Sequence, residues 1–395
     1  MRAAVGVLCF PAVLLACGDA ALDLEAEASS CDPLPTLPFA GETGPIVALN
    51  AYYLQEEAAR AVRRGEPSSA VVEEVFREAA ALGVRAIRTN AFNDDPAKAG
   101  DSAMQVAPLV YDEIALRGLD LVLARARAHG VRLVLPLGNH WDAYGGARQY
   151  VAWAGLPVPR TGDPRFYSAP EVVDHYRAHV IALLSRVNTL DGIRYGEHPA
   201  VLAWELLNEP RGNGLDDAGL AMRAWVDDLA AVVKALAPGH LVGTGEEGFE
   251  EPGSSFALDT ASPWVDYASV HLYPEAWGID PGDVAAFGAA WIAGHAHVAR
   301  ALGKPLLLGE FGLRRDGGFP LVVRRAIYRG WLTCARRGGL AAAAPWLFVN
   351  DARPASWDPL SFAWFDGTDP ADPRNQYVDL VAEAAAPLVA EAAAP

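Results

Sequence analysis

Two glutamates in this sequence each follow a short apolar run, where a buried strand would leave the protein core. Asn208 and Glu209 follow the run VLAWELL and precede a proline, and Glu310 follows LLLG. Two carboxyl groups can cleave a glycosidic bond, because one protonates the departing oxygen while the other attacks the sugar or activates water. A glutamate at a strand end can also cap a helix or pair with an arginine, so the fold that carries both residues decides between these interpretations.

Short apolar segments alternate with longer amphipathic segments from about residue 45 onward. Eight such repeats predict an α/β fold of the (β/α)₈ TIM-barrel type, in a single catalytic domain. A doubly wound open sheet is the alternative, but no GxGxxG follows the first strand and the sequence contains no phosphate-binding loop. We expect the strands within residues 45–54, 84–92, 131–139, 200–209, 240–248, 265–274, 304–312 and 340–348, and the helices within 68–83, 111–130, 170–187, 227–239, 282–303 and 324–338.

In a barrel of this type the carboxyl ends of the strands surround the active site. Glu209 would end the fourth strand and Glu310 the seventh, on roughly opposite sides of the mouth. This shared placement favours glycoside hydrolysis over a structural role for the pair. Glu205 lies inside its strand and suits a structural ion pair, and three weaker candidates fall in loops at the mouth: Glu246, Glu247 and Glu275.

The N-terminus resembles an export signal. The apolar run Ala3–Ala16 is too short to span a bilayer and ends in LLAC, which resembles a bacterial lipoprotein signal whose cysteine, Cys17, is lipidated. Plain secretion with cleavage nearby is the alternative. We therefore expect a signal peptide over 1–17, a flexible Pro-containing tether over 18–42 and the barrel over 43–395. The protein would be exported, and its only attachment to a membrane would be the lipid on Cys17.

Charge and cysteine usage limit the partners and cofactors. The formal net charge of −17 would be repelled by nucleic acids and anionic membranes, so a neutral partner fits best. Nine scattered histidines with no HExxH or CxxC motif predict no metal and no other cofactor. Cys31 and Cys334, which lie beyond the signal region, are candidates for a disulfide that would pin the tether to the domain.

Five stretches resemble successive motifs of glycoside hydrolase family 5, and most of all its endo-β-1,4-mannanases. They occur in order between about residue 46 and about residue 348, on the expected strands. The segment WDAYGG, with QYVAWAG after it, resembles mannanases rather than the cellulases of the family, and the substrate assignment depends chiefly on it. The five stretches are VRAIRTNAFND, GNHWDAYGGARQYVAWAG, HPAVLAWELLNEPRG, VDYASVHLYPEAWG and KPLLLGEFG.

The resemblance implies catalytic roles for residues that match the family motifs. Glu209 would be the general acid/base and Glu310 the nucleophile of a retaining double displacement. Asn208 would bind the sugar hydroxyl beside the reacting carbon, and Arg88, beneath Glu310, would keep the nucleophile ionised. Two residues of the sixth strand would contact the acid/base and the nucleophile, respectively: His271 and Tyr273.

Aromatic residues near the strand ends are candidate sugar platforms, because pyranose C–H faces stack on indole rings. Trp346 ends the last strand and would form the floor under the reacting sugar. Further substrate-contacting candidates fall in the loops that follow the strands, whereas Trp204, Trp225, Trp291 and Trp331 are assigned to packing. The loop candidates are His140, Trp141, Tyr144, Trp277 and Trp364.

The resemblance implies an enzyme that cleaves internal bonds of β-mannan or a related plant polysaccharide, and we expect it to be a monomer. Four positions depart from the mannanase pattern and leave the exact glycan open: Asn90, His140, Gly309 and Leu347. Another β-glycanase or exo-mannosidase activity is one alternative. A non-catalytic, lipid-anchored glycan-binding protein is another, although a binder has no need of Glu209 and Glu310 with Arg88 and Asn208 around them.

Overall fold

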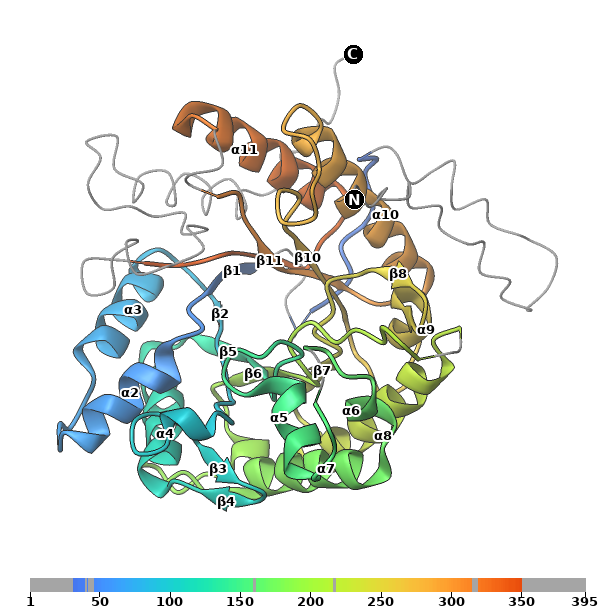
Figure 1. Ribbon diagram of the computed structural model, residues 1–395. Helices are drawn as coiled ribbons and strands as arrows, with labels where there is room; N and C mark the ends of the chain where they lie inside the picture. The colour runs from blue at the N-terminus through green and yellow to red at the C-terminus, as the bar shows by residue number, and fades with distance from the viewer. Residues whose placement is uncertain are drawn as a thin grey trace, which may run out of the picture.

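Eight parallel strands form the centre of the molecule, in the hydrogen-bonded order β10-β11-β12-β1-β2-β5-β6-β7 (Figure 1). A bridge between Gly243 and Tyr267 joins the two ends of this series, so the strands form a barrel. The predicted (β/α)₈ barrel is confirmed, and each expected segment contains one of its strands. These are β1 (Ile46–Asn50), β2 (Ala86–Arg88), β5 (Arg132–Pro136), β6 (Val201–Glu205), β7 (Leu241–Gly243), β10 (Ala268–Leu272), β11 (Leu306–Phe311) and β12 (Ala342–Pro345).

The computed structural model describes residues 31–39, 41, 46–158, 161–215, 218–314 and 319–349. Several sequence predictions lie outside these residues: the signal peptide with Cys17, most of the tether and the candidate platform Trp364. Within the described part of the chain, no helix combines the length and the apolar character needed to cross a membrane.

The six predicted helices are present around the barrel, and their ends follow local chemistry. Asp112 caps α4 by accepting hydrogen bonds from the backbone N–H groups of Ile114 and Ala115, and Gly130 ends this helix in the left-handed conformation, with φ of 67°. The six are α3 (Ala70–Ala81), α4 (Glu113–His129), α7 (Pro170–Ser185), α8 (Leu220–Leu236), α10 (Val284–Ala301) and α11 (Leu321–Arg337).

The sequence analysis missed the shorter elements, most of which lie in loops at the barrel mouth. Their lengths are too short for a periodic pattern to be distinguished, so contacts with the rest of the fold determine them. They are α2 (Leu54–Arg63), α5 (Gly146–Trp153), α6 (Arg165–Ser168), α9 (Phe256–Thr260), the 3₁₀ turns η1 (Pro96–Lys98) and η2 (Tyr195–Glu197), and the hairpins β3 (Gln105–Ala107) with β4 (Val110–Tyr111) and β8 (Glu250–Glu251) with β9 (Ser254–Ser255).

The inside of the barrel changes from apolar to polar toward the mouth. Its lower part is packed by small and aliphatic side chains from several strands, together with Phe39 and Tyr267, whose rings meet edge to face at 5.4 Å. Gly243 is required here, because a Cβ atom at this position would lie 2.4 Å from the Tyr267 ring. The upper part holds buried polar side chains instead, among them Asn50, Arg88 and Glu205.

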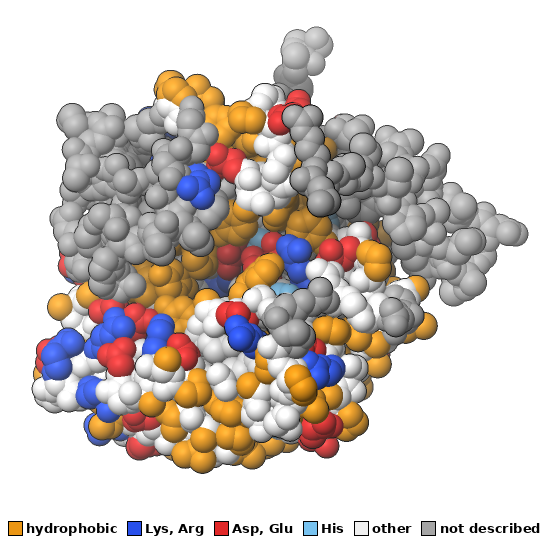
Figure 2. Space-filling model, viewed as in Figure 1, with side chains coloured by type: hydrophobic (Ala, Val, Ile, Leu, Met, Phe, Trp, Pro, Cys, Tyr) orange, Lys and Arg blue, Asp and Glu red, His pale blue; other side chains and the backbone are white. Residues whose placement is uncertain are grey.

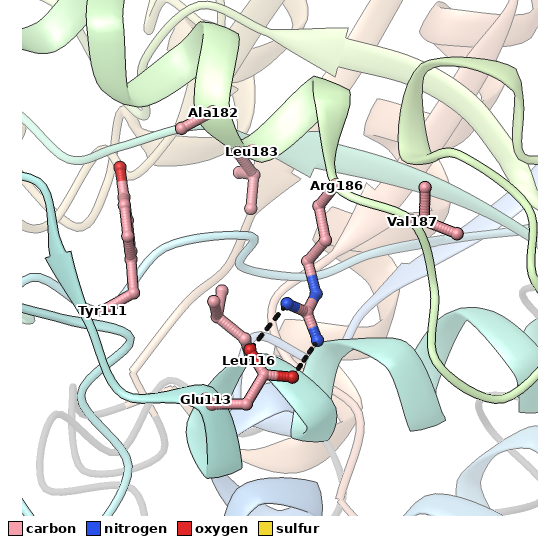
Figure 3. Close-up of a pocket in the computed structure, with 7 residues that line it drawn as sticks. All are labelled: Tyr111, Glu113, Leu116, Ala182, Leu183, Arg186 and Val187. Atoms are coloured by element: carbon pink, nitrogen blue, oxygen red, sulfur yellow. Dashed lines mark hydrogen bonds and ion pairs between the residues drawn. The ribbon is translucent and has the colours of Figure 1, made fainter.

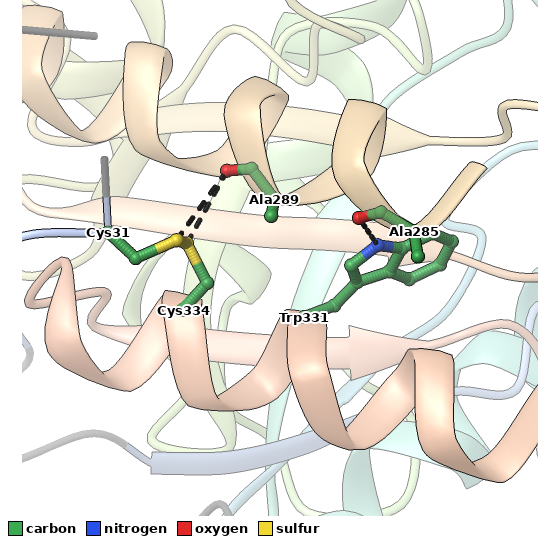
Figure 4. Close-up of a disulfide and its surroundings, with 5 residues drawn as sticks. All are labelled: Cys31, Ala285, Ala289, Trp331 and Cys334. Carbon is green, nitrogen blue, oxygen red and sulfur yellow. Dashed lines mark hydrogen bonds between the residues drawn. A yellow bond between two sulfur atoms is a disulfide. The ribbon is translucent and has the colours of Figure 1, made fainter. Parts of the chain in front are cut away.

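The C-terminal part of the expected tether packs against the barrel, which corrects the prediction of a flexible segment up to residue 42. A disulfide joins Cys31 to Cys334 on α11, with 5.1 Å between the Cα atoms (Figure 4). The N–H of Leu34 donates to the carbonyl of Arg337 at 2.7 Å, and Phe39 is buried at the bottom of the barrel. The buried Phe39 ring holds this segment against the barrel, although its proline-rich composition had predicted a flexible tether.

Loss of the disulfide should destabilise the protein without changing its active site. The bond closes a loop with a sequence separation of 303 residues. Its removal in a Cys31→Ala, Cys334→Ala double variant should cost about 2–5 kcal/mol of unfolding free energy, because the unfolded chain gains freedom. Thermal and urea unfolding should show this loss, and reductant should destabilise the wild type but not the double variant. Equal unfolding midpoints for the two proteins would contradict the assignment.

Candidate active site

The barrel mouth is a hollow in which charged side chains gather. Figure 2 shows acidic and basic side chains, with histidine, inside the hollow at the centre of this face, next to apolar side chains. The strands that surround the hollow present polar residues at or just beyond their carboxyl ends. These residues are Arg88 on β2, Asn208 and Glu209 after β6, His271 on β10 with Tyr273 after it, and Glu310 on β11.

Glu209 and Glu310 lie close together on either side of His271. His271 Nδ1 is 2.6 Å from Glu209 Oε1 and 3.8 Å from Glu310 Oε2. One oxygen of each carboxylate and a ring nitrogen of His271 all lie within 4.8 Å of one another. Retaining glycosidases hold their carboxyl groups about 5–5.5 Å apart and inverting ones about 6.5–9.5 Å, so the observed spacing fits the retaining class.

The surroundings of Glu209 favour its protonated form. Burial raises the pKa of this carboxyl group above its ordinary value, although a hydrogen bond from Trp141 Nε1 to Oε2 and the charge of Arg88 act in the opposite direction. Burial also lowers the pKa of His271 to about 4, so its ring is neutral at neutral pH, and its Nδ1 shares a hydrogen bond with Glu209 Oε1. A carboxyl group with a raised pKa can supply a proton near neutral pH.

The backbone at Glu209 is in the left-handed region, with φ of 53°. Residues other than glycine rarely adopt this conformation, and such strain concentrates at functional sites. The N–H of Glu209 donates to the carbonyl of Gly245 at 2.8 Å, and the N–H of Asn208 donates to Gly138 at 2.8 Å. Neighbouring loops therefore hold this turn on both sides.

Glu310 has donors on both carboxylate oxygens. Arg88 Nη1 donates to Oε1, and the hydroxyl of Tyr273 donates to Oε2 at 2.6 Å. Burial is the largest influence and raises the pKa of Glu310, while His271, Arg88 and Tyr273 lower it. Arg88 thus opposes the effect of burial, in the direction that the sequence analysis expected. At neutral pH, where the His271 ring is uncharged, Arg88 and Tyr273 are the groups that favour the ionised form that a nucleophile needs.

Arg88 connects three polar groups beneath the mouth and is only 4% exposed. Besides Glu310, its guanidinium donates to Glu205 Oε2 at 2.8 Å and to Asn208 Oδ1 at 2.7 Å. Glu205 therefore forms the structural ion pair expected for it, and Tyr267 supports its other oxygen at 3.1 Å.

Asn208 is fixed in one orientation by partners at both ends of its amide. Its oxygen accepts from Arg88, and its Nδ2 donates to Asn139 Oδ1 at 3.0 Å. An amide nitrogen carries two hydrogens, so one donor of Asn208 is still available to a ligand in the mouth. The sequence analysis did not identify Asn139, although it belongs to the GNHW motif that ends the third barrel strand.

Aromatic rings form one wall of the mouth. Trp346, directly after β12, stacks on Tyr52 with 5.2 Å between ring centroids and 4° between ring planes. Tyr144 meets Tyr52 edge to face at 6.2 Å, and Lys98 Nζ lies 3.7 Å from the centroid of the Tyr144 ring. Trp346 is partly buried at the strand end where a sugar floor was expected.

Two predicted substrate-contacting residues pack against other aromatic rings, His140 buried and Trp277 partly buried. His140 is 3% exposed, and its Nδ1 bonds to the hydroxyl of Tyr167 at 2.9 Å, while burial lowers its pKa to about 4. Its ring meets Trp141 edge to face, so it supports that residue. Trp277 packs against Phe249 and Trp291, each at 4.9 Å between ring centroids, in a cluster that α10 supports.

A charged pair extends the mouth, and the sequence analysis named one member, Glu247, as a weaker candidate but missed its partner, Arg211. Arg211 Nε donates to Glu247 Oε2 at 2.7 Å, and its guanidinium lies between the rings of Trp141 and Phe249, at 5.3 and 4.5 Å from their centroids. The rule that led to Glu247 could have found Arg211 as well. Arg211 follows the NEP motif directly, and Glu247 follows the fifth barrel strand, so both satisfy the strand-end rule.

The described residues contain one group that could hold a metal ion, formed by Glu209, His271 and Glu310. Each member already has a hydrogen-bond partner from the protein, and the charge of Arg88 lies against this group. The absence of a metal cofactor stays a prediction from the sequence.

Comparisons with known proteins agree on one family. A family model described as GH family 5 beta-mannosidase-like matches residues 46–358. A rice (Oryza sativa subsp. japonica) relative, mannan endo-1,4-β-mannosidase 3, is 38% identical over 352 residues, which cover 81% of this chain and 72% of that protein. Arabidopsis thaliana mannan endo-1,4-β-mannosidase 7 is 35% identical over 74% of this chain and 71% of its own length. Another rice relative, 39% identical, is matched over only 64% of its length.

Solved structures show the same fold. The endo-1,4-β-D-mannanase of Thermotoga petrophila RKU-1 has a TM-score of 0.74 and 27% identity, covering 85% of this chain and 99% of that one. The endo-1,4-β-mannanase of Rhizomucor miehei has a TM-score of 0.73 and 25% identity, covering 89% of this chain and 99% of that one. The chain belongs to glycoside hydrolase family 5, among its β-mannosidase-like members.

Proposed function

We propose that this protein is a retaining glycoside hydrolase that cleaves internal β-1,4-mannosidic bonds of mannan-type polysaccharides. The spacing of the two buried carboxylates, within 4.8 Å through His271, carries this proposal. The relatives named as mannan endo-1,4-β-mannosidases support the substrate class. A binding protein would gain nothing from burying two carboxylates at a cost in free energy.

In the first step, Glu310 attacks the anomeric carbon while Glu209 gives its proton to the departing glycosidic oxygen. The bond between sugar and leaving group breaks as the ester to Glu310 forms. In the second step, Glu209 takes a proton from water, and the resulting hydroxide displaces Glu310 from the sugar. Two inversions return the original configuration, and both carboxyl groups end in their starting states.

Neighbouring side chains stabilise the charge that develops during these steps. The free amide hydrogen of Asn208 would bind the hydroxyl beside the anomeric carbon, and Trp346 would carry the sugar face. Arg88 and Tyr273 hold the carboxylate of Glu310 so that it meets the sugar in one orientation. Preorganised donors of this kind need no rearrangement at the transition state.

We further propose that the protein is exported, either as a lipoprotein anchored through Cys17 or as a secreted enzyme, and that it acts as a monomer. The disulfide between Cys31 and Cys334 supports export, because disulfides persist in oxidising compartments. A polysaccharide too large to enter a cell also requires an external enzyme.

Substitution of the two glutamates should have different consequences. Glu310→Ala should abolish cleavage of every substrate, and azide should restore turnover of an activated aryl mannoside with inverted product. Glu209→Ala should lose about 10²–10⁴-fold on mannan but cleave the activated substrate, because its leaving group needs no proton. Azide should then yield a product of retained configuration. NMR of the products tests this, and retention with Glu310→Ala would contradict the roles.

Loss of the hydroxyl of Tyr273 should shift the pH profile. This hydroxyl lowers the pKa of Glu310, so Tyr273→Phe should raise that pKa further. Because Glu310 must be ionised to attack, the acidic limb of kcat/KM should move upward by about 1–2 pH units. The basic limb, set by Glu209, should move less. Tyr195→Phe, at a buried tyrosine of η2, is the control and should leave the profile unchanged. An unchanged acidic limb in Tyr273→Phe would refute this role.

Export can be tested at Cys17. In a bacterial host, Cys17→Ser should release the protein from the membrane fraction and leave the specific activity unchanged, because the residue lies far outside the barrel sequence. Fractionation and mass spectrometry of the wild type provide the measurement. A wild-type protein that is soluble and carries no lipid would rule out the anchored form and leave secretion.

A further inference from the structure

A cavity of about 390 Å³ opens on the outer wall of the barrel, between α4 and α7 and beside β4 (Figure 3). Figure 1 places β4 and α7 at the rim of the molecule, whereas the strand ends that carry the two glutamates lie at its centre. The cavity is therefore separate from the mouth. The residues used below are Tyr111, Glu113, Leu116, Leu183, Arg186 and Val187.

Apolar side chains are exposed around this cavity to an unusual extent. The described residues expose ten large apolar side chains, and six of them come from the segments that surround it. Of these six, Val187 lines the cavity itself, and the other five lie on the segments that flank it. The six are Leu109, Val110, Ile114, Ile181, Val187 and Leu190.

The cavity combines an aromatic face with fixed polar groups. Figure 3 shows the ring of Tyr111 edge-on, so that one face is turned toward Leu116, Leu183 and Arg186. The hydroxyl of Tyr111 bonds to His179 Nδ1 at 3.1 Å, which holds the ring in place. The guanidinium of Arg186 is held in one orientation by two hydrogen bonds of 2.9 Å to Glu113 and by hydrogen bonds of 3.0 and 2.7 Å to Asp120.

This combination matches the two chemical surfaces of a pyranose. A sugar ring has an apolar C–H face, which stacks on an aromatic side chain, and a rim of hydroxyl groups, which bond to planar charged side chains. In the cavity, the apolar C–H face would pack on the ring of Tyr111 and on the aliphatic groups of Leu183 and Val187. The hydroxyl groups would bond to Glu113 and Arg186, which are already ordered by their mutual hydrogen bonds, so that binding costs little further side-chain entropy.

The net charge of the protein and the local charge of the cavity favour a neutral ligand over a charged one. The formal net charge of −17 opposes the approach of a second copy of this chain, a nucleic acid or an anionic membrane. At the cavity itself, Arg186 is neutralised by Glu113 and Asp120, so it offers no uncompensated positive charge to an anion. A neutral polymer meets no such repulsion.

We propose that this cavity is a second carbohydrate-binding site, which holds one or two sugar units of a neutral polysaccharide while the barrel mouth acts elsewhere on the same chain. The inference rests on the proposed function for the identity of the polymer. A long chain that is bound at the cavity stays at a high effective concentration near the mouth, whereas a short oligosaccharide cannot reach both sites.

Three variants test this proposal. Tyr111→Ala removes the stacking face, and Val187→Arg fills the cavity from an exposed position without disturbing the contact of Tyr111 with His179. Val322→Arg places the same substitution at an exposed valine of α11, at 72% exposure, and is the matched control. Each is measured by binding to insoluble mannan and by kinetics on soluble long-chain mannan and on mannopentaose.

Tyr111→Ala and Val187→Arg should bind insoluble mannan less and show a KM for the long chain raised by about 3–10-fold. Their kcat/KM on mannopentaose should equal that of the wild type, and Val322→Arg should behave as the wild type throughout. Wild-type binding and kinetics in both cavity variants would overturn the proposal. So would a wild-type dimer that Val187→Arg converts to a monomer with unchanged mannan binding, since the surface would then be a contact between copies.

The two hypotheses fail in different ways. A wild type that cleaves no mannan but binds it less after Val187→Arg would refute the proposed hydrolysis and support the cavity as a glycan site. A wild type that cleaves mannan with kinetics insensitive to both cavity substitutions would retain the hydrolysis and refute the second site.

Discussion

The active site depends on one buried arginine. Arg88 donates to Glu205, Asn208 and Glu310 from a position that is 4% exposed, so its cost of burial is offset only while these partners are in place. Removal of one member of such a buried network leaves an uncompensated charge, which typically costs about 3–5 kcal/mol. Arg88 thereby ties the strand of the nucleophile, β11, to the turn after β6 that carries Glu209. The short distance between the two carboxylates follows from this connection and from His271 between them.

Two chemically identical side chains differ in function here because their neighbours differ. Glu310 is contacted by Arg88 and Tyr273, which favour its ionised form, whereas Glu209 accepts a hydrogen bond from Trp141 and shares one with the neutral ring of His271. Burial raises the pKa of both, and the two charges disfavour each other at this distance. The two carboxyl groups therefore avoid this repulsion when Glu310 is ionised and Glu209 is protonated.

The barrel and the residues at its strand ends could be predicted from the sequence, because both follow regular patterns. Each of the eight strands lies in an expected apolar segment. The strand-end rule identified Glu209 and Glu310, and the family resemblance added Arg88, before any contact was known. Residues held by contacts between loops were harder to place. His140 was expected to contact substrate, and the structure places it, buried, against the ring of Trp141. Arg211 was overlooked, since its position between two rings depends on loops that have no periodic signal. The packed segment from Cys31 to Phe39 was missed because composition does not reveal a single buried ring.

Covalent trapping is the most direct test of the central claim that Glu310 is the nucleophile of a retaining mechanism. The protein would be incubated with an activated 2-deoxy-2-fluoro-β-mannoside, which forms the glycosyl-enzyme quickly and hydrolyses slowly, and then digested for mass spectrometry. The account predicts one added sugar per chain, on the peptide and side chain of Glu310, and none after Glu310→Ala. A sugar attached to Glu209, or no covalent adduct on a protein that turns over the natural substrate, would contradict it.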